Sequence, residues 1–150
     1  MHNPLELAWF LIVFIIPFAG LFAMGYFPAL SLPMLIVRRN WITRVDVYVP
    51  LAGAIGSSVA FLLIGLCGID RFALVSDHVK SVWYTSGYTY ELIQPFFSGV
   101  VSGSIFALLS ALNNRVSQMQ QLAKPVVASA VSFVALWLWP TVVSVCYLHN

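Results

Sequence analysis

Three histidines are the side chains of this sequence best suited to bind a metal ion or to sense pH, because histidine titrates near neutral pH. They are His2, His78 and His149. No two of them have a ligand spacing such as HxxxH, and two of the three stand next to an end of the sequence. We therefore expect neither a metal site nor a cofactor.

Serine is the next candidate for chemistry, as a nucleophile that a neighbouring base activates. No histidine, aspartate or glutamate lies inside the four long apolar stretches, and the sequence has no nucleotide loop, HExxH or GxSxG motif. We expect no enzyme. Ion-coupled transporters and voltage sensors place charged side chains inside the membrane, so their absence from these stretches argues against both classes.

The two cysteines, Cys67 and Cys146, stand near the ends of two apolar stretches that are both expected to run outward. They should therefore lie at similar depth near the outer leaflet. An oxidising exterior would permit a disulfide between them. The alternative is two thiols that pack as small hydrophobic side chains.

These side chains belong to a chain of 150 residues that is 61% hydrophobic and only 8% charged, with a mean hydropathy of +0.92. Soluble domains carry about 25% charged residues. Each of the four apolar stretches exceeds the roughly 18 residues that mark a membrane-spanning helix. We predict one all-α transmembrane domain, residues 1–150, with spans at about 5–27, 47–69, 92–112 and 126–148.

All seven Lys/Arg and five Asp/Glu lie at the ends of these stretches or in the connections. The first and third connections together carry five basic residues: Arg38, Arg39, Arg44, Arg115 and Lys124. The middle connection carries two. The positive-inside rule then places both chain ends outside and these five residues in the cytoplasm, near anionic lipid headgroups. We expect a multi-pass protein of the bacterial inner membrane, with a retained first helix and no nucleic-acid partner.

Prolines bear on the helix boundaries. Pro17, Pro28 and Pro33 interrupt the first stretch, and the residue before a proline avoids helical backbone. We predict a break before Pro28. Residues 28–37 would then be interfacial or re-entrant, or else the end of a tilted first helix. Pro125 should stand in the first turn of the fourth helix, a position that proline favours.

Small residues form faces on two of the predicted helices, which allows helix backbones to approach closely in lipid. They are Gly53, Gly56, Gly99, Ser102 and Gly103, and Gly99 and Gly103 form a GxxxG motif. One interpretation is packing among the second, third and fourth spans. The other is a contact between copies of the chain in a homo-oligomer.

The connection 70–91 is the only one long enough for its own structure. Residues 70–80 could form an amphipathic helix on the membrane, and residues 82–90 could form a hairpin around Ser86 and Gly87. Its aromatic residues are Trp83, Tyr84, Tyr88 and Tyr90. They suit either the headgroup belt or recognition of an external partner.

These features favour a non-catalytic membrane protein that acts through contacts with the bilayer and with other proteins, in a homo-oligomer or a larger membrane complex. Accessory, sensor, inhibitor, immunity and defence subunits belong to this class. The alternative is a small channel or transport subunit in which copies of the chain surround an uncharged pathway. Its lining would come from serines: Ser98, Ser102, Ser110, Ser129 and Ser132.

Overall fold

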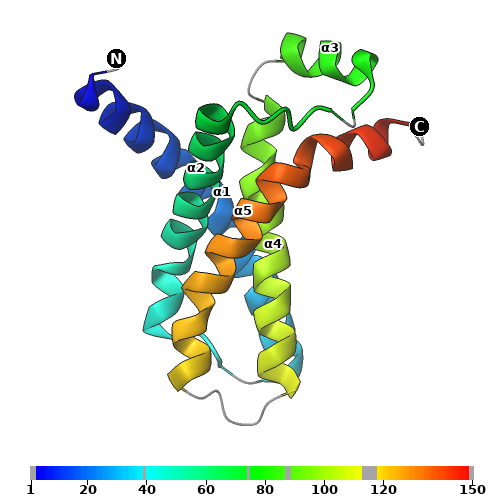
Figure 1. Cartoon of the computed structure of the whole chain (residues 1–150). Coiled ribbons are helices and arrows are strands. Elements are labelled where there is room, and N and C mark those ends of the chain that lie inside the picture. Colours follow the sequence, from blue (N-terminus) through cyan, green and yellow to red (C-terminus); the bar gives the residue numbers. More distant parts are fainter. Residues whose placement is uncertain (1–2, 39, 74, 87–88, 113–117, 149–150) are drawn as a thin grey trace.

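The computed structural model describes residues 3–38, 40–73, 75–86, 89–112 and 118–148 (Figure 1). Within these ranges every regular element is a helix, and no strand occurs. The elements are α1 (Pro4–Val37), the 3₁₀ turn η1 (Arg44–Val47), α2 (Val49–Cys67), α3 (Asp77–Ser86), α4 (Thr89–Leu112) and α5 (Gln118–Leu148).

Four of these helices are long and apolar enough to cross a membrane, as predicted. The candidate spans are Ile12–Val37, Val49–Cys67, Thr89–Leu112 and Gln120–Cys146. Helix α1 packs mainly on α4, and α2 packs mainly on α5. Both chain ends and α3 lie at one end of the bundle, which we call the α3 end (Figure 1). The turn η1 lies toward the opposite end, which we call the η1 end.

Helix α1 does not break at Pro28, so that prediction was wrong. It continues to Val37 and ends where Arg38 takes a left-handed conformation with φ 54°. The reason lies in the turns on either side of the proline. Tyr26 and Leu30 are both fully buried, whereas Pro28 is exposed. Packing of these neighbours keeps the helix continuous through an exposed proline, as neighbouring helices allow in membranes.

Helix α5 begins at Gln118 rather than near Val126, so Pro125 is an interior residue and not the first turn. The polar segment before the fourth apolar stretch therefore belongs partly to the helix. This extension carries Lys124 into the bundle, where its side chain is 2% exposed. The bounds of α2 and α4 agree closely with the predicted spans.

The predicted hairpin is also wrong, because the second half of the connection is helical. Helix α3 spans Asp77–Ser86, so it overlaps the segment 70–80 expected to form an amphipathic helix only at residues 77–80. Val79 and Trp83 are both buried and share one face at the four-residue spacing. Asp77 in the first turn suits the positive end of the helix dipole. Gly87 of the expected turn lies outside the described residues.

The GxxxG motif of α4 packs against α1. A methyl group added at Gly99 would collide with the carbonyl oxygen of Phe22, and one at Gly103 would lie 2.6 Å from the carbonyl oxygen of Tyr26. Gly25 of α1 makes the reciprocal approach to α4. These contacts account for the close pairing of α1 and α4, a partner that the sequence interpretation did not include.

The glycines of α2 have other neighbours in the same chain. Gly53 faces the ring of Phe22 in α1, and Gly56 lies against the backbone of Ser129 in α5. The small faces are therefore filled by contacts within one chain. Gly99 and Gly103 lie against the backbone of α1 in the same chain, and the alternative of a contact between copies of the chain stays a prediction.

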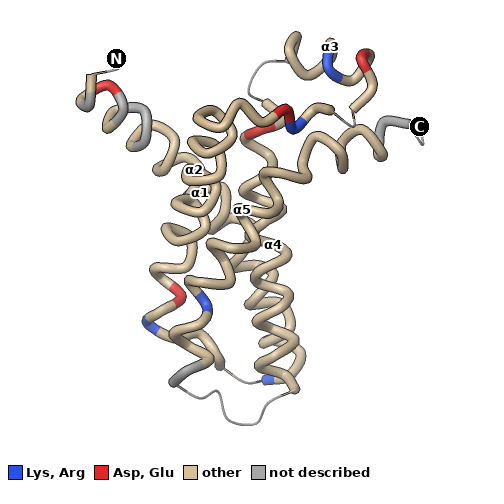
Figure 2. The backbone as a smooth tube through the Cα atoms, in the orientation of Figure 1, with Lys and Arg blue, Asp and Glu red and all other residues tan. Residues whose placement is uncertain are grey.

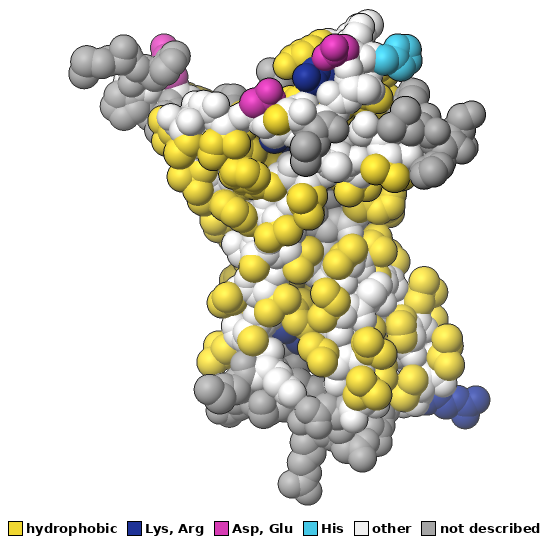
Figure 3. Space-filling model, turned by 45° about the vertical axis from the view of Figure 1, so that its right-hand side comes forward, with side chains coloured by type: hydrophobic (Ala, Val, Ile, Leu, Met, Phe, Trp, Pro, Cys, Tyr) yellow, Lys and Arg dark blue, Asp and Glu magenta, His cyan; other side chains and the backbone are white. Residues whose placement is uncertain are grey.

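The two outer helices separate from the bundle at the α3 end. Figure 1 shows the N-terminal part of α1 and the C-terminal part of α5 leading away in different directions, and Figure 3 shows apolar side chains over much of one face. We call residues 4–13 of α1 the α1 arm. Every described side chain of this arm is exposed. The arm therefore packs on little of its own chain.

Candidate functional site

A buried carboxylate lies near the η1 end, between α1, η1 and α5. Asp46 is 0% exposed, and four groups bind it. The Tyr26 hydroxyl donates to Oδ1, and the Thr43 backbone N–H and hydroxyl donate to Oδ2 at 2.7 and 2.9 Å. The Lys124 ammonium donates to Oδ1 at 2.9 Å and to Oδ2 at 3.0 Å. Figure 2 shows this acid and base side by side.

These hydrogen bonds keep the carboxylate ionised. Burial alone would raise the pKa of Asp46, but the hydrogen bonds from Tyr26, Thr43 and Lys124, with the charge of Lys124, outweigh it and hold the pKa below its ordinary value of 3.8. Lys124 is therefore not available to lipid headgroups, which corrects its expected role. Its ammonium forms an ion pair with Asp46 and lies 6.0 Å from the centre of the Phe106 ring.

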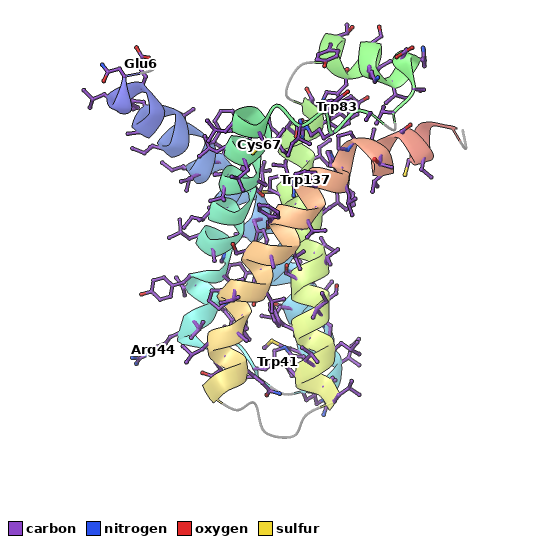
Figure 4. The ribbon with its side chains drawn as sticks, in the orientation of Figure 1. Glu6, Trp41, Arg44, Cys67, Trp83 and Trp137 are labelled. Carbon is purple, nitrogen blue, oxygen red and sulfur yellow. The ribbon has the colours of Figure 1, made fainter. Side chains whose placement is uncertain are left out.

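The connection that supplies Asp46 is fixed at a second point. The Trp41 indole N–H donates to the carbonyl oxygen of Leu30 at 3.2 Å, and Trp41 is 6% exposed (Figure 4). Arg38 and Arg44 are exposed at this end, so a headgroup role for them stays a prediction. Two other residues of that prediction, Arg39 and Arg115, lie outside the described residues.

A second buried ion pair lies at the α3 end. Both guanidinium nitrogens of Arg71 bind the carboxylate of Glu91, and Nη1 also donates to the carbonyl oxygen of Leu136 at 3.4 Å. The side chains of Arg71 and Glu91 are 8% and 6% exposed. The Trp83 indole N–H donates to Glu91 Oε1 at 3.3 Å. This last bond connects α3 to α4.

Of the described residues of the expected outer aromatic surface, Trp83 is buried, Tyr90 is half-buried and Tyr84 is exposed. Trp83 is 4% exposed, and its ring stacks on Tyr90 with 5.0 Å between centroids. The carbonyl oxygen of Tyr90 accepts the Trp139 N–H at 2.6 Å. Tyr84 is 73% exposed and still fits the predicted contact, whereas Tyr88 lies outside the described residues. Trp83 was wrongly assigned to that surface, because Glu91 draws it into the bundle.

Polar groups also meet in the middle of the bundle. Gln94 is fully buried, and its Nε2 donates to the Ser98 hydroxyl at 2.7 Å and to the carbonyl oxygen of Ser132 at 3.3 Å. The Ser57 hydroxyl donates to Gln94 Oε1 at 3.4 Å. Helices α2, α4 and α5 therefore share one hydrogen-bonded layer. Gln94 stands inside an apolar stretch, and the sequence reasoning did not single it out.

The chain matches no protein-family model, no curated protein and no solved structure. The function is therefore inferred from the structure of this chain alone. That geometry joins residues which the sequence keeps far apart, such as Tyr26, Asp46 and Lys124. No spacing rule could have paired them, although the single acid of a basic connection was a signal for an ion pair.

The serines expected to line a pathway between copies lie mostly inside a single chain. Ser98, Ser102, Ser110 and Ser132 are all buried, and Ser129 lies against Gly56. The side-chain oxygens of Ser102 and Ser132 and the indole nitrogen of Trp137 are buried with no hydrogen-bond partner. A pocket of about 90 Å³ opens between α4 and α5, with Phe106 in its mostly apolar lining.

Other sequence-based candidates are simpler to place. Cys67 and Cys146 are both exposed, which does not fit burial as small hydrophobic side chains, and the disulfide stays a prediction. The described residues contain no cluster of three or more potential metal ligands. His78 is exposed, and His2 and His149 lie outside the described ranges.

Proposed function

We propose that this chain is a non-catalytic integral membrane protein that acts by binding another membrane protein through the α1 arm and α3. The observation that carries the proposal is the exposure of the arm. Leu5, Trp9 and Val13 are 67%, 66% and 58% exposed. Within the described residues of the arm no side chain is buried, so the arm offers an apolar surface to lipid and to another membrane protein.

The length of α1 supports this view. Its 34 residues amount to about 51 Å of helix against roughly 30 Å of hydrocarbon. Interfacial apolar helices bind membrane surfaces or protein grooves through such faces. Tyr84 of α3 adds an exposed aromatic ring at the same end of the bundle. Aromatic side chains of this kind are favoured in protein interfaces.

The ion pairs support a non-catalytic role. Both oxygens of Asp46 and both oxygens of Glu91 are hydrogen-bonded to cationic or neutral donors of the same chain. A general base needs a lone pair that can reach a substrate proton. These carboxylates instead clamp the two ends of the bundle, which suits a rigid scaffold that presents a binding surface.

The proposed orientation puts the η1 end in the cytoplasm of a bacterial cell, with the protein in the inner membrane. The exposed Arg38 and Arg44 at that end support it through the positive-inside rule. The α3 end, with the arm and both chain ends, then faces outward. The proposed partner surface lies on the external side.

Site-specific photocross-linking in cells tests the proposal. A benzophenone amino acid at Trp9 or Val13 should give a discrete protein adduct of reproducible mass, and an adduct of twice the chain's mass would identify the partner as a second copy. Ile36, which is 84% exposed at the other end of α1, is the matched control and should react only with lipid. Adducts from Ile36 but not from Trp9 would contradict the proposed surface.

A flux assay separates this function from transport. The purified chain, reconstituted in liposomes, should leave the permeability to small solutes unchanged. Saturable or single-channel flux from the chain alone would overturn the proposal in favour of a channel.

A further inference from the structure

The buried face of α4 carries a row of polar side chains from one end of the bundle toward the other. Its members are Glu91, Gln94, Ser98, Ser102 and Ser110, all buried. Intervals of three and four residues place them on one side of the helix. The four-residue rhythm would put one more polar residue between Ser102 and Ser110, but Phe106 stands there.

Two buried hydroxyls, that of Ser102 in this row and that of Ser132 in α5, lack a hydrogen bond of the kind that other buried serines make. Ser58 and Ser98 each donate to the carbonyl oxygen four residues earlier, at 2.9 and 3.1 Å. Ser102 and Ser132 are 0% exposed, and their hydroxyl oxygens have no partner. An unpaired buried hydroxyl is unfavourable, because it has lost its hydrogen bonds to water without gaining others. Buried polar groups of this kind are commonly satisfied by water.

Along the buried face of α4, Phe106 stands between Ser102 and Ser110, which lines the pocket at the η1 end. Its ring lines that pocket, lies 6.0 Å from the Lys124 ammonium and meets the ring of Tyr26 edge to face at 6.3 Å. Ser110 and Lys124 line the same pocket. Ser102 stands one turn beyond Phe106 on the same face of α4. Apolar constrictions of this kind control hydration by excluding water.

We propose that water enters the bundle through this pocket and hydrates the Ser102 and Ser132 hydroxyls, with Phe106 as the apolar gate between pocket and hydroxyls. The orphaned hydroxyls supply the reason for water to enter, and the pocket supplies the route. Water access from one end needs no through-pore, so this inference stands independently of the proposed partner binding.

Cysteine reactivity measures the hydration. In a background with Cys67→Ala and Cys146→Ala, single substitutions Ser110→Cys, Ser102→Cys and Ser58→Cys are treated with N-ethylmaleimide in membranes, and the rates are read by mass. Ser58 is the matched control because it is slightly more exposed than Ser102, 6% against 0%, and its hydroxyl is already bonded. Static exposure therefore predicts faster reaction at Ser58.

Hydration predicts the reverse order. Ser110→Cys should react fastest, and Ser102→Cys should react about tenfold faster than Ser58→Cys, because only the solvated thiolate attacks the reagent. Adding Phe106→Ala should accelerate Ser102→Cys further and leave Ser110→Cys unchanged. The proposal would be overturned if Ser102→Cys reacted at the same rate as Ser58→Cys or more slowly. If Phe106→Ala left the rate of Ser102→Cys unchanged, Phe106 would not be the gate.

A second measurement avoids the gate variant, which could fold poorly. If Ser102 were dry and unpaired, Ser102→Ala would raise the melting temperature by removing an orphaned group. If water binds the hydroxyl, Ser102→Ala leaves the melting temperature unchanged or lowers it, with Ser104→Ala on the exposed face of α4 as control. A clear rise in the melting temperature contradicts the hydration of Ser102.

Discussion

Lys124 contacts both carboxylate oxygens of Asp46, at 2.9 and 3.0 Å, although 78 positions separate the two residues. The pair joins the start of α5 to η1, and the Tyr26 hydroxyl brings α1 to the same carboxylate. Three segments of the bundle thus meet at one charge. Loss of any one of these partners should lower the stability of the whole η1 end.

Removing one member of this pair should destabilise the protein strongly. Asp46→Asn or Lys124→Met leaves a buried charge uncompensated, which costs about 3–5 kcal/mol. The double variant removes both charges and should recover much of that loss. Thermal unfolding in mild detergent measures the effect. Lys80→Met is the control, because Lys80 pairs with a fully exposed Asp77 side chain; equal losses from Lys80→Met and Lys124→Met would refute the clamp.

The same carboxylate makes a pH prediction. The pKa of Asp46 is lowered in the folded protein, so its contribution to stability is present above its ordinary value of 3.8 and is lost as the pH falls through the folded-state pKa. The stability difference between the wild type and Asp46→Asn should be constant from neutral pH down to about pH 5 and shrink below pH 4. Unfolding curves across this range check it; a difference that vanishes by pH 6 would count against the assignment.

Trp83 should control how firmly α3 is attached. Trp83→Phe keeps the aromatic packing on Tyr90 but removes the hydrogen bond to Glu91, worth about 1.5–3 kcal/mol for a charged acceptor. Hydrogen exchange of the α3 amides should become faster, while exchange in α4 stays nearly unchanged. Tyr84→Phe on the same helix, where the side chain is 73% exposed, should have little effect. Similar exchange in both variants would argue against the anchor.

Gly99→Ala should disrupt the pairing of α1 with α4. The added methyl group would collide with the Phe22 carbonyl oxygen, and overpacking in a close interface costs about 1–3 kcal/mol. Gly65→Ala and Gly20→Ala are matched controls, since a methyl group at either position meets nothing within 4 Å. Melting temperatures compare the three. If Gly99→Ala melts with the controls, α1 and α4 do not pack as described.

The sequence was sufficient for the features that depend on local composition. Uninterrupted apolar runs placed α2 and α4 within a few residues, and helix class and span number followed from the same runs. Pro28 misled because its effect depends on how Tyr26 and Leu30 pack, which no local rule contains. The prediction of a break at Pro28 considered the proline alone and not the packing of Tyr26 and Leu30 in the neighbouring turns.

The candidate site was harder to predict for the same reason. Lys124 and Trp83 were both read as surface residues, one for headgroups and one for an outside partner. Each is buried and bonded to an acidic side chain. Lys124 pairs with Asp46, far away in the sequence, and Trp83 donates to Glu91, eight residues further along the chain. Charge and aromatic content located the right segments. Only three-dimensional contact showed that their polar groups bind one another.

The pairing of α1 with α4 has a consequence for biogenesis. Helix α1 is synthesised first, yet the backbone it fits most closely belongs to the third long helix of the chain. After insertion α1 must remain unpaired on that face while α2 and α3 are made. The Asp46–Lys124 contact forms later still, once α5 has entered. Membrane quality control would therefore encounter a bundle without this ion pair until α5 has been inserted.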